Sequence, residues 1–362
     1  MHRVSVAVGA SGYDITIGDG ALAALPDVLA RHCPAVRYAI IADSTVAGLY
    51  GEVVRAAVAT VGPCDFFTFP AGEWNKTRAQ WETLTDAMGA AGTGRDGAVI
   101  TLGGGVTGDL GGFVASTYRR GIPYVQLPTS LLAMVDSAIG GKTGVDTPQG
   151  KNLVGAFHQP RAVIADVAFL RTLPAPHVRA GLAEAVKHGA IADAALFHRI
   201  GALHTAILDG RPEALEEIVA QSVGIKARVV GRDPLEGGAR AILNFGHTVG
   251  HALETVSGYA LLHGEALAIG MVVEATLGTA MGITREGTAA ALRDSLQALD
   301  LPTTMPDTTP ADLLAVMAHD KKARGGTVKF ALLKEIGQAA QSPDREWTFS
   351  APPELVENVL TH

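Results

Sequence analysis

The chain is poor in cysteine, in aromatic residues and in long apolar runs, and these shortages exclude several classes of protein. Its 362 residues include two cysteines, Cys33 and Cys64, and neither lies in a CxxC motif. A disulfide framework is therefore excluded, and we expect both thiols to pack as small apolar groups in a reducing compartment. No window holds about 18 uninterrupted apolar residues, which predicts that no helix spans a membrane.

Positive charge is also scarce. Lys and Arg total 29 against 36 Asp and Glu, which gives a net charge of −7. A nucleic-acid binder usually carries a basic face, and the chain has no dense Lys/Arg run, so we expect no nucleic-acid partner. An anionic ligand would require basic residues to converge locally. The N-terminal segment alternates polar and apolar residues without the apolar run of a signal peptide, which predicts a cytoplasmic location.

The first half of the sequence has the pattern of an α/β domain. Short Val- and Ile-rich runs alternate with Ala- and Leu-rich stretches of helical period, which indicates a mainly parallel sheet covered by helices on both faces. We predict strands at 37–42, 64–69, 97–102, 124–127 and 162–165, and helices at 44–61 and 76–91.

The second half is mainly helical. We predict helices at 175–208, 212–231, 243–256, 264–281 and 285–299, and a late strand at 327–333. A Leu-Pro-Ala-Pro stretch at 173–176 interrupts the pattern between the two halves. We therefore predict an α/β domain over 1–174 and a helical domain over 175–362.

A glycine-rich loop follows the strand predicted at 97–102. Gly-Gly-Gly-Val-Thr-Gly-Asp at 103–109 joins this strand to a helical stretch at 110–116. Such a loop suits a phosphate or pyrophosphate, because the backbone can approach the ligand closely and the helix N-terminus offers N–H groups. The loop departs from the GxGxxG dinucleotide fingerprint, so a tight structural turn is the alternative.

A second glycine-rich segment carries two lysines, Lys142 and Lys151. Ammonium groups beside glycines suit the binding of phosphate or carboxylate groups. The alternative is a flexible surface loop with solvated lysines. The apolar neighbours at 131–135 and 153–157 predict instead that the segment is held against a core.

Histidines gather in the second half. His247 and His251 are four residues apart in a helical stretch and share one face, and His263 precedes the next helix. The spacing resembles HExxH, but threonine replaces its glutamate, which excludes a zinc protease. Upstream, Glu184 and Lys187 share a helix face. Two imidazoles and a carboxylate form a usual catalytic zinc set; hydrogen-bonded core histidines beside a solvated Glu–Lys pair are the alternative.

Five long motifs are more specific than any of these patterns. They are GGGVTGDLGGFVASTYRRG, LPTSLLAMVDSAIGGKTGVDTPQGKNLVGAFHQP, LPAPHVRAGLAEAVKHG, ARAILNFGHTVGHALE and LLHGEALAIGM. Together they closely resemble the motifs of the 3-dehydroquinate synthase family of sugar-phosphate cyclases. The resemblance implies a Rossmann-like NAD-binding domain, a helical metal- and substrate-binding domain, an active site between them and a homodimer.

The resemblance also implies site residues. It implies Zn²⁺ or Co²⁺ held by Glu184, His247 and His263. For NAD+ it implies contacts from Asp43, Gly72, Glu73, Lys76, Gly105, Val106, Thr107, Gly108, Asp109, Thr129, Ser130, Lys142, Lys151, Phe169, Leu170, Arg171 and Thr172. For a sugar-phosphate substrate it implies Asp136, Lys142, Asn152, Lys187, Lys226, Arg240, Asn244, His251, one of Lys321 and Lys322, and Arg120 of a neighbouring subunit. Each basic group alone could be a solvated surface charge.

The implied activity is the conversion of 3-deoxy-D-arabino-heptulosonate 7-phosphate to 3-dehydroquinate and phosphate, in the shikimate pathway. It proceeds by transient oxidation with NAD+, phosphate elimination, reduction and an intramolecular aldol. Sister cyclases that make aminodehydroquinate, 2-deoxy-scyllo-inosose or valiolone-type products are alternatives, although Lys142, Asn152 and Arg240 favour a substrate with a carboxylate. A metal-dependent polyol dehydrogenase and a non-catalytic dinucleotide-binding module are the remaining alternatives.

Overall fold

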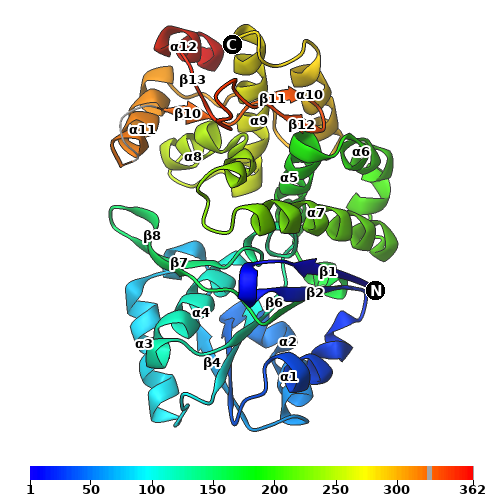
Figure 1. The fold of residues 1–362 in the computed structure, drawn as a ribbon, viewed down its shortest axis with the longest axis vertical. Coiled ribbons are helices and arrows are strands. Elements are labelled where there is room, and N and C mark those ends of the chain that lie inside the picture. Colours follow the sequence, from blue (N-terminus) through cyan, green and yellow to red (C-terminus); the bar gives the residue numbers. More distant parts are fainter. Residues whose placement is uncertain (324–327, 362) are drawn as a thin grey trace. The chain divides into compact units, whose positions relative to one another are not determined.

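The chain forms two compact units in the computed structural model, which describes residues 1–323 and 328–361 (Figure 1). Unit 1 comprises Met1–Leu173 and Leu215–Gly231, and unit 2 comprises Pro174–Ala214 and Arg232–His362. Like the predicted domains, the two units divide near residue 174. Unlike the predicted first domain, unit 1 also includes the later segment Leu215–Gly231.

Unit 1 is built on a seven-stranded sheet with the order β1-β2-β9-β6-β5-β3-β4. The strands are β1 (His2–Val6), β2 (Tyr13–Gly18), β3 (Tyr38–Asp43), β4 (Cys64–Phe69), β5 (Ala98–Gly103), β6 (Tyr124–Pro128) and β9 (Ala162–Asp166). β1 and β2 pair antiparallel, and every other neighbouring pair is parallel. The five predicted strands are all present within one or two residues, because buried Val- and Ile-rich runs between helices suit a parallel sheet.

Helices cover this sheet. They are α1 (Leu25–His32), α2 (Ser44–Ala59), α3 (Arg78–Ala90) and α4 (Gly105–Thr117), and α7 (Pro212–Arg232) supplies the segment that joins unit 1 late in the chain. Side-chain caps set two helix starts. The Asp43 carboxylate accepts hydrogen bonds from the N–H groups of Thr45 and Val46, and the Thr77 hydroxyl accepts one from Gln80 N–H. The predicted α/β class is confirmed.

A separate hairpin occupies the second glycine-rich segment. β7 (Lys142–Thr147) and β8 (Gly150–Phe157) pair antiparallel, where the sequence predicted a loop. We expected the apolar residues at 131–135 and at 153–157 to hold this segment against a core. The expectation is confirmed for 131–135, where Leu131 is buried, and it is wrong for 153–157. Leu153 and Phe157 are 61% and 47% exposed, because β8 pairs only with β7 within the described residues.

Unit 2 is mainly helical. Its helices are α5 (Ala175–Ala192), α6 (Ala194–Leu208), α8 (His247–Val256), α9 (His263–Ala280), α10 (Thr288–Ala298), α11 (Pro310–Ala323) and α12 (Pro353–Thr361). Short strands complete it: β10 (Lys329–Phe330), β11 (Leu333–Glu335), β12 (Gln338–Ala339) and β13 (Phe349–Ser350). The predicted strand at 327–333 is thus two short strands, and its first residue lies outside the described residues. No helix in the described part of the chain has both the length and the apolarity needed to cross a membrane.

The long helix predicted at 175–208 is divided in two. Asp193 leaves the helical backbone with φ of −159°, and its carboxylate accepts hydrogen bonds from the N–H groups of Ala195 and Leu196. This cap ends α5 and begins α6, because an aspartate satisfies N–H groups that otherwise lack partners at a helix start. The break lets α6 pack back on α5, while α5 and α8 both pack on α9.

Candidate metal centre and dinucleotide site

Close helix packing brings the candidate metal ligands of unit 2 together. Gly264 lies in the first turn of α9, beside α5, and a Cβ at position 264 would lie 2.2 Å from the backbone oxygen of Ala180. Only glycine permits this approach. Glu184 lies one turn after Ala180 on α5, and His263 directly precedes Gly264, so the contact places the carboxylate beside the imidazole.

A second glycine contact places His247. Gly246 precedes α8 with φ of 80°, a conformation that favours glycine, and its carbonyl oxygen would lie 2.1 Å from a Cβ at Gly270 of α9. α8 therefore starts directly against α9, and its first residue is His247.

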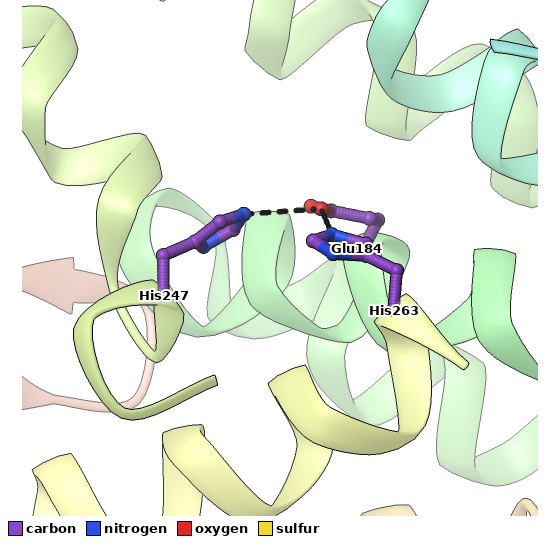
Figure 2. A group of neighbouring side chains, drawn as sticks. All are labelled: Glu184, His247 and His263. Atoms are coloured by element: carbon purple, nitrogen blue, oxygen red, sulfur yellow. Dashed lines mark hydrogen bonds and ion pairs between the residues drawn. The ribbon is translucent and has the colours of Figure 1, made fainter. Parts of the chain in front are cut away.

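These contacts produce a compact set of donor atoms (Figure 2). Oε1 of Glu184 lies 3.1 Å from Nε2 of His263 and 3.5 Å from Nε2 of His247. The three ligand atoms all lie within 4.8 Å of one another. Zinc bonds to carboxylate oxygen and imidazole nitrogen at about 2.0–2.2 Å, so one cation can contact all three, and the donor set fits Zn²⁺.

The charges around this set also suit a cation. The Lys187 ammonium forms an ion pair with the Glu184 carboxylate, and both side chains are 1% exposed. Burial acts to raise the pKa of Glu184, but Lys187 and the two imidazoles outweigh it and hold this pKa well below its usual range. Burial and the Lys187 charge lower the pKa of His247. An ionised carboxylate and a neutral imidazole are the forms that bind a metal.

His263 differs from His247. Burial acts to lower its pKa, but hydrogen bonds to Glu184 and Glu254 raise it to about 10. A protonated imidazolium thus balances the carboxylates, and a cation that binds there has to displace this proton. The alternative of a solvated Glu–Lys pair is wrong, since Glu184 and Lys187 are buried.

Other predicted substrate residues of unit 2 lie on or near the same elements. Arg240 is 2% exposed, its N–H donates to the Asp233 carboxylate at 2.9 Å, and its guanidinium donates to the Pro234 carbonyl at 2.8 Å. Asn244 donates to Glu236 at 3.3 Å. The His251 ring is 5.2 Å from the His247 ring. Lys321 and Lys322 lie outside the residues whose side chains the structure describes.

The glycine-rich loop of unit 1 lies at the carboxyl edge of the sheet. α4 begins at Gly105, so the helix predicted at 110–116 starts earlier and includes Asp109. In the sheet, β4 pairs with one edge of β3, and β5, the next strand along the chain, pairs with the other edge. The strand order therefore reverses between β3 and β5. Open α/β sheets bind ligands at such a reversal. Asp43 ends β3 there, and its carboxylate accepts a hydrogen bond from the Thr107 hydroxyl at 3.3 Å.

A buried lysine that precedes α3 contacts Asp109 of α4. Lys76 is 4% exposed, and its ammonium lies 2.8 Å from Glu73, 3.3 Å from Asp109 and 3.7 Å from Asp146. Burial raises the pKa of Asp109 to about 6, although Lys76 acts in the opposite direction. The family resemblance names Glu73, Lys76 and Asp109 as NAD+ contacts but not Asp146, and only the fold shows that Asp146 lies beside Lys76.

The structure places other predicted residues of unit 1 in two settings. Thr129 and Ser130 follow β6, beside the glycine-rich loop, and Thr129 N–H donates to the Gly103 carbonyl at 2.9 Å. A short 3-10 helix, Val167–Thr172, holds Phe169 and Leu170 buried. In it, Arg171 pairs with Asp19 at 2.8 Å.

The substrate residues predicted in unit 1 are partly brought together. Lys226 of α7 donates to the Asp136 carboxylate at 2.5 Å and to the Asp136 carbonyl at 2.7 Å. Because Lys226 is 5% exposed, the alternative of a solvated surface lysine is wrong for it. Asn152 has φ of 56°, and its N–H donates to Asp146 at 2.8 Å. Arg120 is exposed, with φ of 70°.

Comparisons with known proteins agree with these observations. Two family models match the chain: 3-dehydroquinate synthase N-terminal over residues 66–180, and 3-dehydroquinate synthase C-terminal over residues 181–323. A curated relative from Symbiobacterium thermophilum, named 3-dehydroquinate synthase, is 49% identical over 93% of this chain and 95% of its own.

Solved structures of similar fold include two cyclases. A 2-deoxy-scyllo-inosose synthase complexed with carbaglucose-6-phosphate, NAD+ and Co²⁺ has a TM-score of 0.92 and 26% identity, over 99% of both chains. The 2-epi-5-epi-valiolone synthase of Streptomyces hygroscopicus subsp. jinggangensis, with NAD+ and Zn²⁺ bound, has a TM-score of 0.86 and 31% identity, over 96% of both chains.

Proposed function

The chain belongs to the 3-dehydroquinate synthase family, and from this premise we propose that it converts 3-deoxy-D-arabino-heptulosonate 7-phosphate to 3-dehydroquinate and phosphate. It would be a carbon–oxygen lyase of the shikimate pathway, which leads to the aromatic amino acids. The observation that carries the proposal is the set of donor atoms from Glu184, His247 and His263, all within 4.8 Å of one another.

We propose that the resident groups are NAD+ and a divalent cation, Zn²⁺ or Co²⁺. Both are named in the two solved cyclases of similar fold. When bound, the metal supplies a Lewis acid toward a substrate hydroxyl, and NAD+ accepts a hydride and returns it. Imidazole and carboxylate also accept divalent ions other than zinc.

The protein's own residues hold and orient the reactants in this proposal. Glu184, His247 and His263 hold the cation. The other groups contact the anionic substrate: Asp136, Lys142, Asn152, Lys187, Lys226, Arg240, Asn244, His251, one of Lys321 and Lys322, and Arg120 of a neighbouring subunit. Fixed positive groups reduce the cost of bringing a carboxylate and a phosphate to an acidic protein.

We propose that NAD+ binds at the carboxyl ends of β3 and β5. The reversal of strand order there, the glycine-rich start of α4 and the Asp43–Thr107 hydrogen bond support this placement. The contacts would come from Asp43, Gly72, Glu73, Lys76, Gly105, Val106, Thr107, Gly108, Asp109, Thr129, Ser130, Lys142, Lys151, Phe169, Leu170, Arg171 and Thr172.

We propose a cytoplasmic homodimer. Exposed Arg120 and its neighbour Arg119 support the dimer. Both have a positive φ, which is 52° for Arg119, and two consecutive non-glycine residues in this left-handed backbone region are unusual without a role. The expected location follows from the absence of a membrane-spanning helix in the described residues and from the class of reaction.

Phosphate release tests the activity. The full chain, supplied with NAD+ and Zn²⁺, should release phosphate from the heptulosonate phosphate, and a chelator should stop the release until Zn²⁺ is restored. Release that continues unchanged after complete metal removal would contradict the proposal.

The same assay separates the alternatives. Faster release from an amino analogue or from glucose 6-phosphate would identify a sister cyclase. A polyol dehydrogenase would accumulate NADH, which absorbance detects, whereas a cyclase returns the hydride and accumulates none.

A further inference from the structure

Two buried carboxylates lie in α8 and α9, beside the candidate metal centre but outside its ligand set. Glu254 of α8 is 6% exposed, and Glu274 of α9 is fully buried. Burying a carboxyl group is unfavourable unless hydrogen bonds compensate for lost water, so each position needs a physical reason. The neighbours of each group supply one.

Glu254 contacts the far side of one candidate ligand. Its Oε2 lies 3.4 Å from Nδ1 of His263, while Nε2 of the same ring lies 3.1 Å from Glu184. An imidazole that donates its Nδ1–H to a carboxylate keeps the lone pair of Nε2 for a metal, and the same bond fixes the ring orientation. Glu254 thus selects the nitrogen that His263 presents to the cation.

Glu274 contacts the helix turn that carries the other histidine. One of its oxygens accepts a hydrogen bond from Gly246 N–H at 2.7 Å, and the other accepts one from Val249 N–H at 3.1 Å. These N–H groups belong to the start of α8, where no intrahelical partner exists. Gly246, the residue that precedes α8, has no side chain to cap them. Glu274 therefore caps α8 from the neighbouring helix.

We propose that Glu254 and Glu274 are positioning residues, each on the helix opposite the ligand that it positions. Glu254 of α8 orients His263 of α9, and Glu274 of α9 fixes the first turn of α8, which begins with His247. The inference rests on the proposed function in one respect, that Glu184, His247 and His263 bind the metal. It adds two residues that affect metal binding by positioning the two histidines.

Zinc affinity of the metal-free full chain, measured by competition with a chromophoric chelator, tests the inference. Loss of such an outer partner weakens metal binding about 10- to 100-fold, and we expect this loss for Glu254→Ala. Glu254→Gln should lose less, because its amide oxygen still accepts from Nδ1–H. We expect about 10-fold weaker binding for Glu274→Gln, which keeps one of the two acceptors.

A structural role alone predicts a different result. It would lower the melting temperature of the metal-free protein without changing the zinc affinity of the folded fraction. NAD+ affinity should stay unchanged, because the proposed NAD+ residues belong to unit 1. The matched control is Glu335→Gln, a half-buried glutamate of unit 2 whose side chain is 39% exposed and pairs with Arg285.

Double-mutant cycles assign each carboxylate to its histidine. In a His263→Ala background, Glu254→Ala should weaken zinc binding no further, whereas Glu274→Gln should still do so. The reverse is expected in a His247→Ala background, because residues that act through one ligand are not additive.

Three results would overturn the inference, and only the last of them would also overturn the proposed metal centre. Wild-type zinc affinity in both Glu254→Ala and Glu274→Gln, or equal effects in the two backgrounds, would overturn the positioning roles alone. A wild-type chain that binds no Zn²⁺ would overturn the proposed metal centre as well.

Discussion

At the scale of single residues, Glu184 carries the central charge of the candidate metal centre. Its carboxylate is almost fully buried and meets Lys187, His247 and His263. The sequence motifs point to all four residues. Spacing alone also allows an alternative, hydrogen-bonded core histidines beside a solvated Glu–Lys pair, because Glu184 and His247 are far apart in the chain. Burial, which only the fold supplies, excludes the solvated Glu–Lys pair of that alternative.

The first prediction concerns His247. Replacing His247 with alanine removes one of three donor atoms, and we expect zinc to bind so weakly that the purified variant retains no stoichiometric zinc and loses phosphate release. Zinc content by mass spectrometry and phosphate release are measured on the same preparation. A variant with a full equivalent of tightly bound zinc and normal turnover would contradict the ligand assignment.

The second prediction concerns Lys76. Lys76→Met leaves the carboxylates of Glu73, Asp109 and Asp146 without their shared cation, and breaking a buried pair costs about 3–5 kcal/mol of unfolding free energy. The wild-type pKa of Asp109 is raised to about 6, and loss of Lys76 raises it further. Asp109 in the variant is therefore protonated at pH 5, which relieves the repulsion, and ionised to a larger extent at pH 8.

The loss of stability should accordingly be larger at pH 8 than at pH 5. Urea unfolding of both proteins at the two pH values measures it, with Lys329→Met as the control, since Lys329 makes an exposed pair with Glu346. An equal loss at both pH values would argue against carboxylate repulsion.

At the scale of secondary-structure elements, close contacts at glycines determine which helices meet at the candidate site. Gly264 lets α9 begin against α5, and Gly246 and Gly270 let α8 begin against α9. The apolar periodicity predicts these helices, but it does not predict which faces touch. The same limit explains the break at Asp193 and the β7–β8 hairpin, where local capping and strand pairing prevail over the pattern of apolar residues.

The third prediction concerns Gly264. A methyl group at this position would overlap the backbone of Ala180, so Gly264→Ala forces α9 away from α5 and separates His263 from Glu184. We expect weaker zinc binding and lower stability, because the added atom meets backbone that cannot rotate aside. Zinc competition and thermal unfolding measure both. The control is Gly201→Ala in α6, where nothing lies within 4 Å of the added methyl group.

At the scale of the whole molecule, the sequence predicts the fold class and the family correctly. Alternating strand and helix patterns, a helical second half and five long motifs predict a Rossmann-like unit followed by a helical one, and the structure has both. The sequence does not predict that Leu215–Gly231 joins unit 1, since a helix that packs on a distant segment has the same apolar period as one that packs nearby.

The fourth prediction concerns metal removal from the whole protein. The helices α5, α8 and α9, which carry the candidate ligands, pack through buried side chains and glycine contacts, so chelation should leave the helical content intact. Far-ultraviolet circular dichroism before and after chelation measures this. Restored zinc should raise the melting temperature, because a ligand that binds only the folded state stabilises it. Unfolding on chelation would show that the site depends on metal to form.

Anomalous diffraction at the zinc edge, from a crystal of the zinc-loaded chain, tests the central claim most directly. The account predicts one strong peak at about 2.0–2.2 Å from a Glu184 carboxylate oxygen and from Nε2 of both His247 and His263. A peak bound by other residues, with these three side chains left out of its coordination sphere, would contradict it.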